Sequence, residues 1–145
     1  MPEAKAARSF TKASVRDAEV EGRRVLVRAD LNVPLEKGVV ADDTRIRASL
    51  PTIELLRERG ASVVLVSHLG RPKGPEPALS MAPVGERLGE LLGAEVNQAP
   101  AVVGDEVAEM ASGLEAGDLL LLENSRFEAG ETKNDPPLAE ALAAL

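Results

Sequence analysis

The chain has 145 residues, a length that suits one domain with a hydrophobic core of its own. Its formal net charge is −7 and its only aromatic residues are Phe10 and Phe127, which argues against a nucleic-acid surface or an anionic-membrane surface. The absence of cysteine excludes disulfides and thiolate metal sites, and one histidine cannot build a zinc site of the usual kind, so we expect no metal site. An anion site in this acidic chain has to be a local cluster of basic side chains.

Residues 1–24 are mostly polar and carry few helix or strand signals. Charged side chains interrupt residues 1–8, so neither a signal peptide nor a membrane span is expected. Together with the lack of cysteine, this predicts a cytoplasmic protein.

The apolar run within residues 24–28 predicts the first strand of a buried parallel sheet. Arg28, Asp30 and Asn32 follow at a spacing of two, so in an extended chain they point to one side. Pro34 ends the strand, because it has no backbone N–H to donate. Polar groups at a strand end indicate a ligand site in an open α/β fold, or else only a hydrogen-bonded turn. On this stretch alone, both interpretations stay open.

Residues 44–59 predict an amphipathic helix, with Asp43 or Thr44 capping its start and Gly60 following its end. Pro51 inside this range predicts that the helix begins near Pro51 or is kinked there. The apolar face of the helix consists of Ile46, Leu50, Ile53 and Leu56.

The rest of the chain alternates between strands and helices. Strands are expected over 63–66, 94–96 and 118–122, helices over 83–92 (capped by Ser80), 105–112 and 136–145, and loops over 36–43 and 73–78. This alternation predicts an α/β fold with a doubly wound parallel sheet, a Rossmann-like three-layer α/β/α arrangement. The last helix has no strand after it, so we expect the sheet to be incomplete at its C-terminal end and the chain to be truncated.

Parallel strands with right-handed crossovers bring their carboxyl ends to one edge of the sheet. Arginine binds phosphate and carboxylate through a planar fork, and the neighbouring carboxylate and amide can bind a hydroxyl group. A small phosphorylated hydroxy acid would satisfy all of these groups. The residues expected at this edge are Asp30, Asn32, Arg45, His68, Arg71 and Arg126.

Each of these residues also has a purely structural interpretation. Arg71 and Arg126 could be solvated loop charges, and His68 could be a structural histidine. Arg45 could pair with Asp42 or Asp43, and Asp30 could hold Arg28. The chain has no glycine-rich nucleotide-binding motif and no serine nucleophile elbow, so its residues indicate an anion site without a nucleotide site.

Four segments, in this order, resemble the N-terminal domain of the phosphoglycerate kinase family, and the resemblance runs from about residue 15 to the end. They are RADLNVP (28–34), DTRI (43–46), SHLGRP (67–72) and LENSRF (122–127). Ala29 and Leu31 stand where the family usually has a larger apolar residue and Phe.

The resemblance implies that residues 1–145 are part of a phosphoglycerate-binding domain, without the hinge and the nucleotide-binding domain. The family activity is reversible phosphoryl transfer from 1,3-bisphosphoglycerate to Mg-ADP, giving 3-phosphoglycerate and ATP in glycolysis. Mg²⁺ with ATP or ADP would be bound mainly by the missing domain. A monomer that binds neither nucleic acid nor membrane is expected, and this chain alone is expected to be inactive.

The resemblance also assigns roles to residues of this chain. Asp30 and Asn32 would contact the glycerate, and His68, Arg71 and Arg126 would hold its phosphate. Arg45 would be catalytic and steady the phosphoryl group in flight, because phosphoryl transfer depends mostly on positioning and cationic stabilisation. Three further substrate-binding residues are implied, namely Leu31, Leu69 and Gly70.

Two alternatives remain open from the sequence. The first is a non-enzymatic anion-binding module or inactive fragment. The second is an aspartate-nucleophile phosphatase with Asp30 as nucleophile, although such enzymes want a second Asp where this chain has Asn32.

Overall fold

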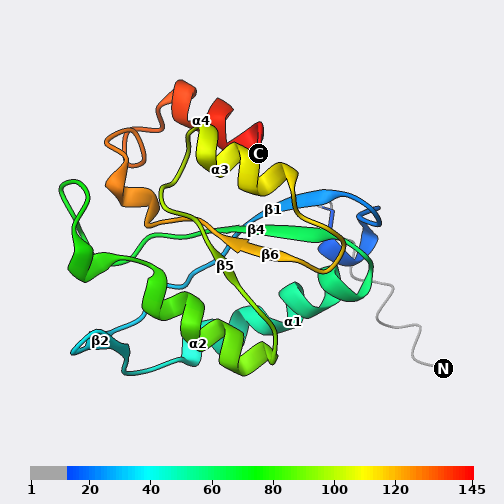
Figure 1. Ribbon diagram of the computed structural model, residues 1–145, viewed down its shortest axis with the longest axis horizontal. Coiled ribbons are helices and arrows are strands. Elements are labelled where there is room, and N and C mark those ends of the chain that lie inside the picture. The colour runs from blue at the N-terminus through cyan, green and yellow to red at the C-terminus, as the bar shows by residue number, and fades with distance from the viewer. Residues whose placement is uncertain (1–12) are drawn as a thin grey trace.

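The computed structural model describes residues 13–145 and shows a parallel sheet between two layers of helices (Figure 1). All neighbouring strands of this four-stranded sheet run parallel. The first part of the predicted polar lead-in, residues 1–12, lies outside the described residues. In spatial order the strands are β1 (Arg24–Arg28), β4 (Ser62–Val66), β6 (Leu119–Leu121) and β5 (Asn97–Gln98).

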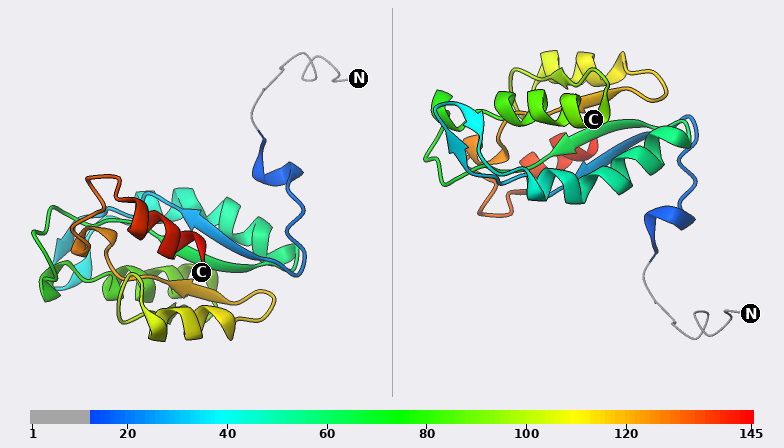
Figure 2. Two further views of the ribbon diagram at one scale, coloured as in Figure 1. Left: turned by 90° about the horizontal axis from the view of Figure 1, so that it is seen from above. Right: turned by 90° about the horizontal axis from the view of Figure 1, so that it is seen from below.

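The helices cover both faces of the sheet, as Figure 2 shows from above and below. Helices α1 (Thr44–Glu58) and α2 (Ala82–Leu92) pack on one face, and α3 (Asp105–Ser112) and α4 (Pro136–Ala143) lie on the other. This arrangement confirms the predicted doubly wound, three-layer α/β/α fold. Short 3-10 helices are η2 (Val15–Asp17), η3 (Pro77–Leu79) and η4 (Ser125–Phe127).

The core is divided by the sheet, because successive side chains of a strand point to opposite faces. Val63 and Leu65 of β4 pack with the residues of α1 and α2, whereas Val64 and Val66 pack with those of α3. All five residues of β4 are buried, which is the continuous hydrophobic pattern expected of a central parallel strand.

Helix α1 confirms the predicted apolar face and excludes a helix start near Pro51, while the alternative of a kink at Pro51 stays a prediction. The helix begins at Thr44 and continues through Pro51, which is exposed. Burying Ile46, Ile53 and Leu56 contributes about 1.5–3 kcal/mol for each side chain, and the three together exceed the cost of about 3 kcal/mol for an interior proline. Gly60, at φ +82°, follows the end of the helix as predicted.

The start of α1 agrees only in part with the predicted cap. Asp43 occupies the N-cap position, as predicted, but its side chain makes no capping hydrogen bond. Instead Asp42 accepts hydrogen bonds from the Thr44 backbone N–H (2.9 Å) and hydroxyl (2.6 Å), which holds the pKa of Asp42 below its usual value. At α2 the predicted cap is partly realised, because the Ser80 hydroxyl accepts from the N–H of Ala82 at 3.2 Å.

Both edge strands differ from their predictions. Strand β1 is not fully buried as expected, because it lies at the sheet edge and its Leu26 is 40 % exposed. The predicted strand 94–96 is wrong, since β5 lies at Asn97–Gln98. There the side-chain amides of Asn97 and Gln98 donate to β6 carbonyls, whereas the Ala94 N–H closes the end of α2 on the Gly89 carbonyl.

The predicted loop over 36–43 contains a small antiparallel hairpin of β2 (Leu35–Glu36) and β3 (Val39–Val40). Lys37 and Gly38 form its turn with φ +52° and +77°. Two consecutive positive φ values are those of the type I′ turn, whose usual sequence signals, Asn-Gly and Asp-Gly, are absent here.

A buried amide ties together the loops that leave the carboxyl end of the sheet. Asn124 is fully buried, and its Oδ1 accepts from the N–H groups of Leu69 and Arg126, both at 3.1 Å. Its Nδ2 donates to the carbonyls of Leu69 (2.7 Å) and Leu79 (2.9 Å). One side chain thus fixes the loop after β4, η3 and η4 to one another.

We predict that Asn124→Ala lowers the free energy of unfolding by about 3 kcal/mol, because it leaves several buried backbone groups of these loops without partners. Asn97→Ala is the matched control, since that amide makes one side-chain hydrogen bond, to the Leu119 carbonyl. Urea unfolding followed by circular dichroism measures both. A loss no larger than that of the control would contradict the role of Asn124.

Candidate functional site

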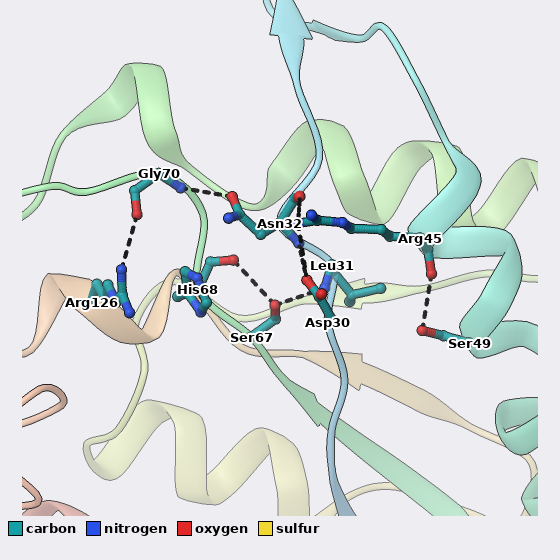
Figure 3. Close-up of polar contacts among 9 residues, drawn as sticks. All are labelled: Asp30, Leu31, Asn32, Arg45, Ser49, Ser67, His68, Gly70 and Arg126. Atoms are coloured by element: carbon teal, nitrogen blue, oxygen red, sulfur yellow. Dashed lines mark hydrogen bonds and ion pairs between the residues drawn. The ribbon is translucent and has the colours of Figure 1, made fainter.

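The strand ends converge on one edge of the sheet and bring most of the predicted site residues together (Figure 3). Asp30 and Asn32 follow β1, Arg45 lies in the first turn of α1, His68 and Gly70 follow β4, and Arg126 lies in η4. Side chains separated by nearly 100 positions in the chain therefore form one polar surface.

Arg45 reaches across to the loop after β1. Its Nη1 donates to the Asn32 carbonyl at 2.7 Å and lies 3.5 Å from Asp30 Oδ1. Both side chains of this ion pair are more than half exposed, so solvent screens the pair and a bound anion could compete for Arg45. Asp30 also accepts from the N–H of Asn32 at 3.2 Å, so the turn interpretation of Asp30 is realised as well.

Gly70 links the two halves of the site. Its N–H donates to Asn32 Oδ1 at 3.0 Å, and its carbonyl lies 3.5 Å from Nη1 of Arg126. The residue adopts φ +64°, a conformation that favours glycine, and a Cβ here would lie 3.0 Å from a methyl carbon of Leu79, which would have to shift slightly. The predicted position Gly70 is thus a backbone element of the site.

His68 lies beside Arg126, and no ring hydrogen bond joins it to another described residue. Burial lowers the pKa of its imidazole, and the positive charges of Arg126 and then Arg28 lower it further, while Glu131 and Asp30 act in the opposite direction. Its ring is consequently neutral near pH 7 and available to accept or donate one hydrogen bond.

Leu31 and Leu69 are predicted site residues whose side chains belong to the core. Leu31 is fully buried and its N–H donates to Ser67 Oγ at 3.0 Å. Leu69 is 2 % exposed, and both of its backbone groups are bonded to Asn124. The side chains of these two residues pack in the hydrophobic core, so they support the polar surface without adding polar groups to it.

Arg71 is exposed and makes no hydrogen bond or ion pair with residues 13–145, so it is free to reach a ligand.

The structural alternatives, in which Arg45 pairs with Asp42 or Asp43 and Asp30 pairs with Arg28, are not realised. Asp43 pairs with Arg47 (2.9 Å) and Arg87 (2.7 Å), which lowers the pKa of Asp43, and the ion-pair partner of Asp30 is Arg45 in place of Arg28.

Sequence reasoning missed three supporting residues. Ser67 joins the ends of β1 and β4, Asn124 ties the loops, and Glu131 accepts from the side chains of Ser125 and Arg126. Ser67 follows β4 directly and Asn124 lies three positions after the end of β6, so their closeness to strand ends is a signal that could have found them. Glu131 has no such signal, because it lies in a turn well after η4.

The surface beside Arg45 is hollowed. Asn32, Pro34, Thr44 and Arg45 help to line a cavity of about 370 Å³. A larger cavity of about 720 Å³ lies at the other end of α1, where acidic and basic side chains alternate around Gly60. The smaller cavity is the one that adjoins the converging strand ends.

The arrangement suits a small organic anion that carries a hydroxyl group. Arg45, Arg71 and Arg126 present N–H donors, and Asp30 and Asn32 offer groups for a hydroxyl. Among residues 13–145 no three His, Asp or Glu side chains gather as metal ligands, and no helix in that range has the length and apolar character needed to cross a bilayer.

Comparison with known proteins agrees with this geometry. The family model of phosphoglycerate kinase matches residues 15–145. A curated phosphoglycerate kinase of Fervidobacterium nodosum is 50 % identical over 135 residues, which are 92 % of this chain and 34 % of that protein. The chain therefore spans about a third of the length of this relative.

Two solved structures are similar to the whole arrangement of strands and helices. Phosphoglycerate kinase from Pyrococcus horikoshii OT3 is 36 % identical with a TM-score of 0.76, and the match covers 83 % of this chain and 30 % of that one. Phosphoglycerate kinase from Coxiella burnetii is 34 % identical with a TM-score of 0.77, over 90 % of this chain and 32 % of that one. The sequence motifs, the fold and the family match lead to one conclusion: the chain belongs to the phosphoglycerate kinase family.

Proposed function

We propose that residues 1–145 form the phosphoglycerate-binding part of a phosphoglycerate kinase, which catalyses reversible phosphoryl transfer between 1,3-bisphosphoglycerate and Mg-ADP. The observation that carries this proposal is the convergence of Arg45, His68 and Arg126 with Asp30 and Asn32 at one sheet edge. A phosphate, a carboxyl group and a hydroxyl group on one small molecule account for this mixture of donors and acceptors.

The residues divide this task by their chemistry. His68, Arg71 and Arg126 hold the phosphate of the glycerate. Asp30 and Asn32 bind its hydroxyl and carbon skeleton. Leu31 and Leu69 support the site from the core, and Gly70 contributes its backbone N–H and carbonyl groups.

Arg45 is the residue that we assign to catalysis. It lies in the exposed first turn of α1 and is held by one strong hydrogen bond, to the Asn32 carbonyl. A transferring phosphoryl group carries charge spread over its oxygens, so a guanidinium at the carboxyl end of the substrate stabilises the transition state. The weak contact with Asp30 can be exchanged for the phosphoryl oxygens.

The described residues do not fit a Mg-nucleotide site. Residues 13–145 hold no cluster of three acidic or imidazole side chains, and the sequence has no phosphate-binding glycine motif. We therefore assign ATP, ADP and Mg²⁺ to a part of the enzyme outside these residues. A cytoplasmic location, a monomeric state and a role in glycolysis stay predictions.

Titration of the ¹⁵N-labelled chain with 3-phosphoglycerate should shift the signals of Arg45, His68, Arg71 and Arg126, and added salt should weaken binding because the contacts are ionic. Arg71→Gln should weaken binding about tenfold, which is about 1.4 kcal/mol. Arg23→Gln is the matched control, since that exposed arginine lies at the amino end of β1, whereas the candidate site lies at the carboxyl ends of the strands. If none of the four residues responds, the assigned site is wrong.

Binding of a dianion should strengthen as the pH falls, because the pKa of His68 is lowered in the free protein and a nearby anion favours the charged ring. Sulfate is the suitable probe, since its charge stays constant between about pH 5.5 and 7.5 while an unperturbed histidine titrates near 6.5. The dissociation constant for sulfate, measured by calorimetry, should become smaller as the pH is lowered across this range. His68→Gln should remove the dependence, and an equal slope in that variant would contradict the assignment.

The chain alone should form no ATP from 1,3-bisphosphoglycerate and Mg-ADP, because the nucleotide site is assigned elsewhere. ATP formation should appear when the nucleotide-binding part of a relative is supplied in a coupled assay. The same mixture with Arg45→Gln should lose at least about a hundredfold in rate, as expected when a donor to transition-state charge is removed. Trapping of an aspartyl phosphate on Asp30 would favour the phosphatase alternative instead.

A further inference from the structure

Glu131 places a second carboxylate, besides that of Asp30, next to the basic side chains of the candidate anion site. Its side chain is 9 % exposed, against 29 % for its partner Arg126. A carboxylate at this depth needs both a counter-charge and hydrogen bonds, because burial otherwise disfavours its charged form. The question is what this buried negative charge contributes next to a phosphate-binding arginine.

The two carboxylate oxygens have separate partners. Oε2 accepts from the Ser125 hydroxyl at 2.8 Å, and Oε1 accepts from Nε of Arg126 at 3.3 Å. Ser125 is itself 5 % exposed, and its N–H donates to the Ser67 carbonyl at 2.9 Å. The carboxylate is thus anchored through Ser125 to the end of the central strand β4.

The turn that carries Glu131 is closed by its own backbone. The Glu131 N–H donates to the Glu128 carbonyl (3.2 Å), and the Asp135 N–H donates to the Gly130 carbonyl (3.1 Å). A Cβ at Gly130 would lie 2.5 Å from Cβ of Asp135, so this turn needs glycine to close. Glu131 is therefore presented from a tight turn, with its side chain directed toward η4.

The contact leaves most of the Arg126 fork available. Nε bonds to Glu131 and Nη1 lies 3.5 Å from the Gly70 carbonyl, so Nη2 has no partner among residues 13–145. Binding a ligand with a mobile arginine has an entropic cost for ordering the side chain, and an arginine that is held beforehand has already lost that freedom.

We propose that Glu131 is a positioning residue, which holds the Arg126 guanidinium in its ligand-binding orientation through Nε while Ser125 holds Glu131. This inference rests on the proposed function of the site, because it deepens the role of Arg126 as a phosphate ligand. The competing role for Glu131 is only to reduce the positive potential around Arg126. The two roles predict opposite effects on anion affinity when Glu131 is neutralised. Affinity falls if Glu131 positions Arg126, and it rises if Glu131 only reduces the positive potential.

Glu131→Gln separates these roles, since the amide oxygen can still accept from Ser125 but carries no charge for Arg126. We expect a dissociation constant for 3-phosphoglycerate about tenfold weaker, corresponding to about 1.4 kcal/mol. Glu128→Gln is the matched control, because it makes the same charge change three positions away and its carboxylate bonds to no residue in 13–145. Binding that is unchanged or tighter in Glu131→Gln would overturn the proposal.

Two measurements on the ligand-free chain test the positioning directly. The Nε–Hε signal of Arg126 should exchange slowly with solvent in the original chain and rapidly in Glu131→Gln. The imidazole pKa of His68, the one histidine of the chain, should fall in Glu131→Gln and stay unchanged in Glu128→Gln, because Glu131 counteracts Arg126 and Arg28 there. Equal Hε exchange in the original chain and Glu131→Gln would refute the role of Glu131.

Ser125→Ala keeps every charge and provides the second variant should Glu131→Gln fail to fold. It should increase Hε exchange and weaken 3-phosphoglycerate binding by about threefold, and an unchanged Hε exchange rate in this variant would equally overturn the proposal. If the original chain does not bind 3-phosphoglycerate at all, the proposed function fails, while the Hε measurement still decides whether Glu131 holds Arg126.

Discussion

The site depends on one buried amide, that of Asn124. Its four hydrogen bonds join backbone groups up to 55 positions away, and the two bonds to Leu69 are buried, so those two groups would otherwise lack a partner away from solvent. The same side chain sets the path of His68–Gly70 and begins the short helix that carries Arg126. The positions of His68, Gly70 and Arg126 therefore depend on the hydrogen bonds of the Asn124 side chain. These bonds link the stability of the loops to the geometry of the candidate anion site.

A second network fixes the other half of the site. Asp43 bridges Arg47 of α1 and Arg87 of α2, so the start of α1 is held against its neighbour two positions before Arg45. Arg45 itself stays exposed and lightly held. The start of α1 is thus held by ion pairs, while the Arg45 side chain is 54 % exposed and the Arg126 side chain, which pairs with Glu131, is 29 % exposed. The two arginines of the candidate site therefore differ in exposure and in partners.

The sequence predicted the layers of the fold and the edge of the sheet where polar groups meet, because buried strands such as Val63–Val66 and amphipathic helices have clear periodicities. It did not predict the path of β5, where Asn97 and Gln98 replace the expected apolar strand residues, or the hairpin turned by Lys37-Gly38. The candidate site was predicted through residues adjacent to strand ends. Glu131 could not be found this way, since its role comes from a turn that folds back onto η4, a contact that no periodicity encodes.

The order of the strands has a consequence for how the chain reaches this state. Strand β5 precedes β6 in the sequence, yet β6 lies between β4 and β5, so β5 has no partner until β6 has inserted. Pairings between distant segments slow folding, because the loop must close before contacts offset its lost entropy. The same insertion brings Asn124 and Arg126 to the loop after β4. The candidate anion site is therefore complete only once the long-range pairing of β4 with β6 has formed, because Arg126 and the amide of Asn124 follow β6.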